Sequence, residues 1–150
     1  MYDKLHFKKI IMTQLSAEKK LRIRFSEVDS MNIVWHGSYS LYFEDAREEF
    51  GRKYQLDYLY MFEKGFYAPL VELHFNFKRP LTYKDEPIIE IVFRDTNAAK
   101  LIFDYTIFSS NKSEIIATGH TIQVFLDRDY KLVWNTPDFI IEWKKMNGIR

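Results

Sequence analysis

The chain has 150 residues and a net charge of +1, a size that fits one domain and a charge too small to attract nucleic acid or an anionic membrane from a distance. Hydrophobic residues make up 47% of the chain and charged residues 29%, which indicates a globular protein and excludes a disordered one. The chain contains no cysteine, which excludes a disulfide scaffold, a thiolate nucleophile and a zinc site with cysteine ligands.

Residues 1–18 are predicted to form an N-terminal extension of the domain. The apolar part of this segment is too short and too charged for the hydrophobic region of a secretory signal. No stretch of the sequence approaches the roughly 20 apolar residues of a membrane span. We therefore expect a cytoplasmic protein without a membrane span.

The first half of the chain predicts one strand and two helices. Residues 21–25, "LRIRF", alternate between apolar and charged residues like a half-buried strand. A helix is expected to follow from about residue 36 and to end near Gly51, and residues 56–65 predict a second, short helix that stops at Gly65. The apolar face of the longer helix has the spacing i, i+3, i+4, i+7 and i+11, and consists of Tyr39, Tyr42, Phe43, Ala46 and Phe50.

The second half of the chain switches to a period of two. Residues 71–78, "VELHFNFK", alternate strictly, and Pro80 ends this strand. Three further strands are predicted at residues 87–95, 100–110 and 114–127, with turn-like segments between them. Such short connections favour antiparallel pairing of neighbouring strands.

The chain is predicted to end in a helix over residues 136–147, with Thr136 as its cap and Pro137 at its first position. One long helix against one antiparallel sheet gives a single α+β domain over residues 1–150. The other face of the sheet and its edges need cover, which suggests a dimer.

The segment with the clearest chemistry is "EVDSMNIVWHGSY", which joins the first predicted strand to the long helix. Asp29 precedes a turn in which Asn32 tolerates a left-handed backbone, and the helix begins near His36. The first N–H groups of a helix have no partner within it, so they can donate hydrogen bonds to a developing oxyanion. A carboxylate beside them could attack an acyl carbon or deprotonate water.

A carboxylate is a weak base, so this arrangement favours an activated acyl group such as a thioester over an amide. From the residues alone, Asp29 could equally be a turn or cap residue, and His36 a packed or capping histidine. Glu44 and Arg47, spaced i, i+3, could form a surface ion pair. No cluster of His, Asp and Glu has the spacing of a metal site, and the sequence has no G-x-S-x-G motif or phosphate-binding loop.

Three stretches together resemble the hotdog-fold acyl-CoA thioesterases, most closely the 4-hydroxybenzoyl-CoA thioesterase and YbgC-like branch. They are "RFSEVDSMNIVWHGSYSLYFEDARE", "ELHFNFKRPLTYKDE" and "ATGHTIQVFLD", within residues 21–127. The resemblance implies a hotdog fold, in which a curved antiparallel sheet of about five strands wraps a long helix. It also implies a homodimer or homotetramer with active sites at the subunit interface.

By matching positions, the resemblance implies that Asp29 is the catalytic carboxylate and that the N–H of His36 polarises the thioester carbonyl, with its imidazole near the substrate. The departure from the family pattern is Asn32, which stands where the family commonly has glycine. Three basic residues near the mouth of the site, Lys78, Arg79 and Lys84, are candidates for the nucleotide phosphates, with solvated surface charges as the alternative reading. The implied substrate-binding residues are Asn32, Val34, Trp35, Tyr39, Glu44, Lys78 and Arg79.

The function that we expect is hydrolysis of an acyl-CoA thioester to a free acid and CoA, without a cofactor. Acyl-carrier-protein thioesters are a close variant of the substrate. Two alternatives are a dehydratase that acts on acyl thioesters on the same fold, and a non-catalytic dimeric module that binds acyl thioesters or partner proteins. The sequence does not specify the acyl group.

Overall fold

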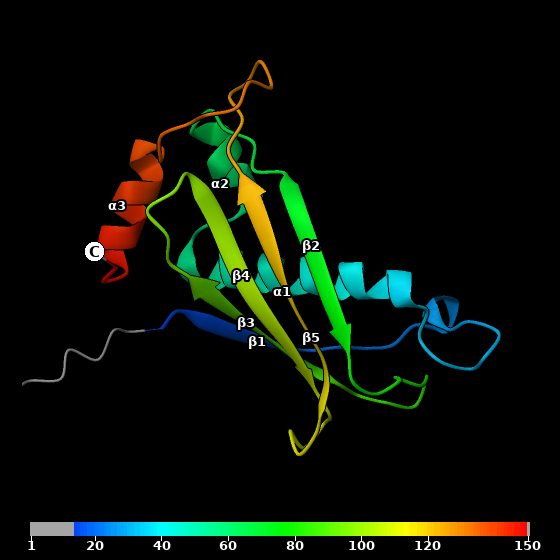
Figure 1. Cartoon of the computed structure of the whole chain (residues 1–150). Helices are drawn as coiled ribbons and strands as arrows, with labels where there is room; N and C mark the ends of the chain where they lie inside the picture. The colour runs from blue at the N-terminus through cyan, green and yellow to red at the C-terminus, as the bar shows by residue number, and fades with distance from the viewer. Residues whose placement is uncertain (1–13, 150) are drawn as a thin grey trace, which may run out of the picture.

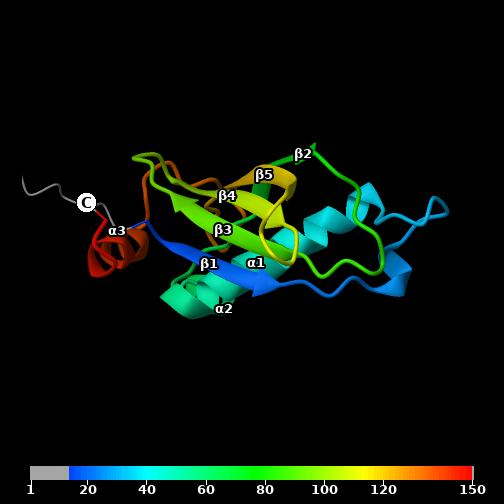
Figure 2. The same cartoon turned by 90° about the horizontal axis from the view of Figure 1, so that it is seen from below.

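A curved sheet and the helix that it wraps form the protein (Figures 1 and 2). The structure is a computed structural model and describes residues 14–149. The sheet is antiparallel, with five strands in the order β1-β3-β4-β5-β2. The strands are β1 (Ser16–Lys20), β2 (Leu70–Phe77), β3 (Ile88–Arg94), β4 (Lys100–Phe108) and β5 (Ile115–Val124). The helices are α1 (Tyr39–Tyr54), α2 (Tyr58–Glu63) and α3 (Asp138–Met146), with short 3-10 turns η1 (Phe25–Glu27) and η2 (His36–Ser38). The predicted α+β class is confirmed.

The first strand lies earlier in the chain than predicted. Residues 16–18, expected in an extension, belong to β1, while residues 1–13 of that extension lie outside the described residues. Leu21 donates one hydrogen bond to the carbonyl of Pro87 (2.8 Å), and the ladder with β3 then stops. Proline has no N–H to donate, so pairing cannot continue past it. The predicted strand at 21–25 is therefore wrong, although Leu21 and Ile23 are buried as its alternation required.

The predicted apolar face of α1 is confirmed, because all five of its side chains are buried. The helix continues past Gly51 and ends at Gln55, which takes the left-handed conformation (φ 56°). Gly51 has a packing role instead, since a Cβ there would lie 3.0 Å from the Leu56 carbonyl oxygen. The C-terminal end of the helix was thus predicted one turn too early.

The centre of α1 packs into a hollow in the sheet. The Phe43 ring stacks on Tyr105 of β4, with ring centroids 3.9 Å apart and planes 4° from parallel. Gly119 of β5 makes room for this ring, because a Cβ at that position would lie 2.7 Å from it and 2.2 Å from the His74 carbonyl oxygen. A larger residue at 119 would separate helix from sheet.

The helix α3 covers one end of the core, away from the 25–35 segment (Figure 1). It begins at Asp138 with Pro137 at the N-cap and no capping side chain, so the predicted Thr136 cap is wrong. Trp143 is buried, and its Nε1 donates a hydrogen bond to the Tyr54 carbonyl (2.8 Å). This contact fixes α3 to the C-terminal end of α1.

Strand β2 is an outer strand that pairs only with β5. Its predicted alternation is present, since Phe75 and Phe77 point toward α1, where they contact Phe43 and Tyr39. The side chains of this face are nevertheless poorly covered, with Val71 60% and Phe77 48% exposed. The free edge and its apolar side chains have no cover within the described chain.

None of the helices among residues 14–149 is long and apolar enough to cross a membrane. A location in the cytoplasm stays a prediction.

Candidate functional site

Asp29 lies in a tight turn that the sequence encodes locally. The turn is closed by a bridge between Val28 and Val34 and by the Asp29 N–H, which donates to the Ile33 carbonyl (2.8 Å). Asn32 has φ 63°, so the predicted left-handed residue is confirmed. Asn is among the residues that adopt this conformation at low cost, which explains how it can stand where the family has glycine.

The two carboxylate oxygens of Asp29 have different roles. Oδ1 accepts a hydrogen bond from the Met31 N–H (2.8 Å), so Asp29 is indeed a turn residue. Oδ2 has no hydrogen-bond partner in the described part of the chain, and the side chain is half-exposed. One oxygen therefore holds the turn while the other is available for chemistry.

The chain enters α1 through the 3-10 turn η2. Trp35 donates its N–H to the Glu27 carbonyl (2.8 Å), and Ser38 donates its N–H to the Trp35 carbonyl (2.9 Å). The N–H groups of His36 and Gly37 meet no acceptor within residues 14–149. They are the unpaired donors expected at the start of a helix, with the positive end of its dipole behind them. The His36 imidazole is exposed and packs against the Trp35 ring.

A pocket of about 260 Å³ joins the Asp29 turn, the start of the helix and the end of β2. Most of the predicted site residues meet there, including Asp29, His36 and Tyr39. Asn32, Trp35 and Glu44 do not line it. The lining residues are Asp29, Met31, Ile33, Val34, His36, Tyr39, Phe77, Lys78, Arg79 and Pro80. We call this candidate active site the catalytic pocket.

Phe77 was not predicted to belong to the site. Its ring lies 4.8 Å from that of Tyr39, edge to face, and forms one wall of the catalytic pocket. The strict alternation of β2 carried the signal, because it places Phe77 on the same face as Phe75, toward the helix. Burial raises the pKa of Tyr39 above its usual value, so its hydroxyl remains protonated and can donate a hydrogen bond.

The two predicted basic residues of the pocket differ in what they can do. Arg79 Nε lies 2.8 Å from Glu114, and its guanidinium is 3.8 Å from Asp85. Lys78 is exposed and takes part in no ion pair among the described residues. Lys78 is thus the cation that is available to a ligand, whereas Arg79 holds together the loops around it.

Glu44 lies on α1, one turn beyond the pocket, and pairs with Arg47. The expected surface pair is only half right, because the Arg47 side chain is 13% exposed. Its guanidinium donates to the Tyr105 hydroxyl (3.1 Å), which in turn is 2.8 Å from Thr121 Oγ1. Glu44 and Arg47 line a second cavity of about 800 Å³, which reaches Leu70 at the start of β2.

Glu27 and Tyr42 form a buried contact behind the pocket, which was not predicted from the sequence. The Tyr42 hydroxyl donates to the Glu27 carboxylate. Burial, together with this hydrogen bond, raises the pKa of Tyr42 well above its usual range. The pair joins η1 to α1 and so fixes the segment that leads into the Asp29 turn.

No group of three or more His, Cys, Asp or Glu residues within residues 14–149 is arranged to hold a metal ion. The polar groups that the pocket presents include the Asp29 carboxylate, the N–H groups of His36 and Gly37, and the Tyr39 hydroxyl.

Comparison with known proteins identifies the family to which this fold belongs. The family profile described as the thioesterase-like superfamily matches residues 23–144. The chain belongs to the thioesterase-like superfamily. The expected hotdog fold and the expected class of enzyme, a thioester hydrolase, are thereby confirmed at the level of the family.

Members of this superfamily with related sequences come from bacteria and plants. The Bacillus subtilis protein named "Putative acyl-CoA thioesterase YneP" is 28% identical over 109 residues, which cover 72% of this chain and 79% of that protein. The Arabidopsis thaliana protein named acyl-acyl carrier protein thioesterase ATL3 is 28% identical over 116 residues, 77% of this chain and 61% of that protein.

Solved structures of the superfamily share the fold. The DHNA-CoA thioesterase of Staphylococcus aureus is 24% identical with a TM-score of 0.77, and the match covers 87% of this chain and 90% of that one. A 4-hydroxybenzoyl CoA thioesterase with bound 4-hydroxybenzoyl CoA is 20% identical with a TM-score of 0.74, over 86% and 98% of the two chains. At these identities the likeness concerns the fold alone.

Proposed function

We propose that this thioesterase-like protein hydrolyses acyl-CoA thioesters to a free carboxylic acid and CoA, with Asp29 as its catalytic carboxylate. The observation that carries the proposal is the catalytic pocket, in which a carboxylate with a free oxygen lies beside the unpaired N–H groups of a helix start. The name of the related B. subtilis protein supports CoA as the thiol.

In the general-base route, Asp29 Oδ2 takes a proton from a water molecule, whose oxygen attacks the thioester carbon. The carbonyl oxygen becomes an oxyanion and accepts hydrogen bonds from the N–H groups of His36 and Gly37. The tetrahedral intermediate collapses, the C–S bond breaks, and the thiolate leaves. The proton held by Asp29 returns to the thiolate or to water, so the carboxylate is restored.

In the nucleophilic route, Asp29 Oδ2 attacks the same carbon and the thiolate leaves, which gives a mixed anhydride that water then hydrolyses. The two routes differ in the fate of the water oxygen. In a single turnover in heavy-oxygen water, label that enters Asp29 supports the nucleophilic route. Label found only in the product acid is expected for the general-base route, and rapid-quench trapping of an acylated Asp29 would contradict that route.

We also propose a homodimer in which the β2 strands of two subunits pair antiparallel, with a homotetramer as a further possibility. The free edge of β2 and its exposed apolar residues support this pairing. Antiparallel pairing sets the Leu70 end of one β2 beside the Phe77 end of the other. The cavity of about 800 Å³ that Glu44 lines would then face the catalytic pocket of the partner subunit, which gives Glu44 its expected place near a substrate.

The test is thiol release, followed with a thiol-reactive dye, from a panel of short, long and aromatic acyl-CoAs. Asp29→Asn keeps an oxygen for the Met31 N–H, so its turn should survive. Asp129→Asn, at another exposed aspartate, is the matched control. We expect Asp29→Asn to lose about 10²-fold or more of kcat and the control to match the wild type.

Two results would overturn parts of the proposal. Full activity in Asp29→Asn would remove Asp29 from the chemistry. A folded wild-type protein that cleaves no acyl-CoA, but cleaves the same acyl groups on an acyl carrier protein, would reassign the thiol carrier, as the name of the Arabidopsis relative suggests. Absence of turnover with both carriers would overturn the proposed hydrolysis and leave the two alternatives, a dehydratase and a non-catalytic binding module.

A further inference from the structure

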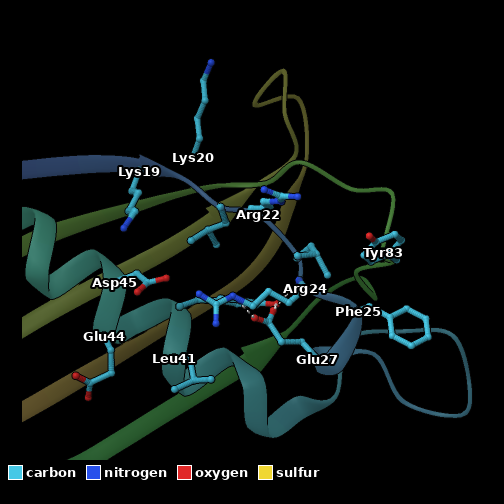
Figure 3. Close-up of a pocket in the computed structure, with 13 residues that line it drawn as sticks. Lys19, Lys20, Arg22, Arg24, Phe25, Glu27, Leu41, Glu44, Asp45 and Tyr83 are labelled. Atoms are coloured by element: carbon cyan, nitrogen blue, oxygen red, sulfur yellow. Dashed lines mark hydrogen bonds and ion pairs between the residues drawn. The ribbon is translucent and has the colours of Figure 1, made fainter.

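A third concavity, of about 610 Å³, lies next to the catalytic pocket, between the end of β1, the segment that follows it and the flank of α1 (Figure 3). We call it the basic pocket. Its cations are Lys19, Lys20, Arg22 and Arg24, and its exposed aromatic residues are Phe25 and Tyr83. The proposed mechanism uses none of these residues.

The charge of the basic pocket is less balanced than its composition suggests. Its acids Glu27 and Glu44 are engaged, the first by Tyr42 and the second by Arg47, and Asp45 is the remaining one. Within the described part of the chain, Lys20 and Arg22 are exposed and take part in no ion pair. Lys20 points away from α1 at the rim of this hollow (Figure 3), and two free cations at the rim, with Arg22 as the second, favour a ligand with clustered negative charge, such as a phosphorylated one.

The aromatic residues of the basic pocket leave ring faces open to solvent. Phe25 is 81% exposed and Tyr83 51% exposed, and the two rings meet edge to face with centroids 6.1 Å apart. Figure 3 shows both rings at the same end of the pocket. An edge-to-face pair leaves flat surfaces on which a planar base can stack. Cations beside open aromatic rings are the features that a nucleotide needs.

The two pockets share a wall. Tyr42 and Glu27 line the basic pocket, Tyr39 and Asp29 line the catalytic pocket, and the rings of Tyr39 and Tyr42 are 5.7 Å apart. A ligand anchored in the basic pocket could therefore extend a flexible arm over this wall to Asp29. CoA has that shape, with a phosphorylated adenosine at one end and the thioester at the other.

We propose that the basic pocket binds the nucleotide end of the acyl-CoA substrate, with Lys20 and Arg22 on its phosphates and with Phe25 and Tyr83 against its adenine. This inference rests on the proposed function, because it assigns the remote half of the same substrate. The inference makes Lys20 and Arg22 the principal phosphate ligands in place of Lys78, Arg79 and Lys84, because Arg79 is held by Glu114 and Asp85 and Lys78 lines the catalytic pocket instead.

The first experiment measures binding without turnover, by calorimetry with adenosine 3′,5′-bisphosphate and with free CoA. The variant reverses two charges, Lys20→Glu with Arg22→Glu. The control reverses two exposed charges elsewhere, Lys131→Glu with Lys145→Glu, so that the net charge is equal. We expect the variant to lose roughly tenfold or more in affinity for both ligands and the control to bind as the wild type does, because attraction becomes repulsion only in the basic pocket.

The second experiment compares an acyl-CoA with the same acyl group on pantetheine, which lacks the nucleotide. We expect the double variant to raise KM for the CoA ester and to leave kcat/KM for the pantetheine ester unchanged. Equal CoA affinity in the variant and the wild type would overturn the inference. So would a change in oligomeric mass with no change in CoA affinity, which would mean that a second copy of the chain covers this surface.

The two proposals can fail separately. If the protein binds CoA through the basic pocket but hydrolyses no thioester, the nucleotide site stands and the proposed hydrolysis is lost. If it hydrolyses pantetheine and CoA esters equally well in all variants, the proposed hydrolysis stands and the nucleotide site is lost.

Discussion

At the scale of single residues, His36 combines two groups that could act on a thioester, its backbone N–H and its imidazole. The N–H points from the start of the helix and has no acceptor in the described chain, whereas the imidazole is exposed and packs on Trp35. The proposed mechanism uses the N–H. The roles of the N–H and the imidazole can be tested separately, because the backbone donor can be removed without disrupting the helix.

His36→Pro removes the N–H, and His36→Ala keeps it. Proline is tolerated at a first helical position, and Trp35 already has the extended conformation (φ −61°, ψ 135°) that precedes proline. We expect His36→Pro to lower kcat by roughly 10²-fold, the cost of one oxyanion donor, and His36→Ala to lower it only a few-fold. Steady-state thiol release on both variants, with circular dichroism to check folding, measures this. An equal loss in both would assign the role to the imidazole.

Tyr42 predicts a pH dependence of stability. Its pKa is raised in the folded protein, first by burial and then by the Glu27 carboxylate, so the neutral hydroxyl is favoured by folding. This contribution is complete below the unfolded pKa of about 10 and is lost as the pH rises above it. We expect the wild type to be more stable than Tyr42→Phe at pH 8, and this advantage to shrink from about pH 10 upward.

Urea unfolding of the wild type and Tyr42→Phe between pH 7 and pH 11 measures the difference between their free energies of unfolding. Tyr58→Phe is the matched control, because Tyr58 is 71% exposed on α2. A stability difference for Tyr42→Phe that stays constant over the whole range would contradict the assignment of the buried contact with Glu27.

At the scale of elements, β2 is the strand whose apolar side chains are least covered by the rest of the described chain. It has one hydrogen-bonded neighbour, and the side chains it turns toward α1 include Leu73, which is 41% exposed. An exposed apolar edge strand is unstable against pairing with another chain, and natural proteins protect such an edge with charges or cover it. Here the one Asp, Glu, Lys or Arg between residues 70 and 77 is Glu72, which contacts His120 of β5, so cover by a second copy is the expected solution.

Leu73→Lys places a charge on this surface. If the β2 strands pair, the lysine would be buried at the dimer seam, and we expect the variant to sediment as a monomer in analytical ultracentrifugation. We also expect thioester hydrolysis to fall with the dimer fraction, because the partner would supply Glu44. Leu132→Lys is the control, since Leu132 is 42% exposed and lies on another loop. An unchanged mass for Leu73→Lys would rule out the proposed dimer interface between the two β2 strands.

At the scale of the whole molecule, the elements that could be predicted are those whose burial follows a period in the sequence. Strands β3 to β5 bury about every second side chain, and α1 buries side chains that are three or four residues apart. Both periods are visible in the sequence. Strand β1 was missed because only Ala17 of its five residues is buried, which leaves no alternation to read. The ladder ends at Pro87, which lies far from β1 in the sequence.

The same distinction holds for the site. Asp29, Asn32 and His36 are joined by a local turn, so their proximity could be predicted from the sequence. The contact between Glu27 and Tyr42, the engagement of Arg79 by Glu114, and the basic pocket depend on the packing of η1, α1 and the loop at Tyr83. Such contacts arise from tertiary structure, and no periodic pattern in the sequence predicts them.

The strand order also has a consequence for how the chain folds. Hairpins β3-β4 and β4-β5 join near neighbours, but the sheet is completed by distant pairings, such as Ser16 with Val92 and Leu73 with Thr121. Closing long loops costs entropy before any contact compensates for it, and proteins dominated by such pairings fold in milliseconds to seconds. We expect the β3-β4-β5 meander to form early and β2 to dock onto it late. The edge that would join two subunits is then among the last parts of the monomer to take shape, so assembly must wait for folding to finish.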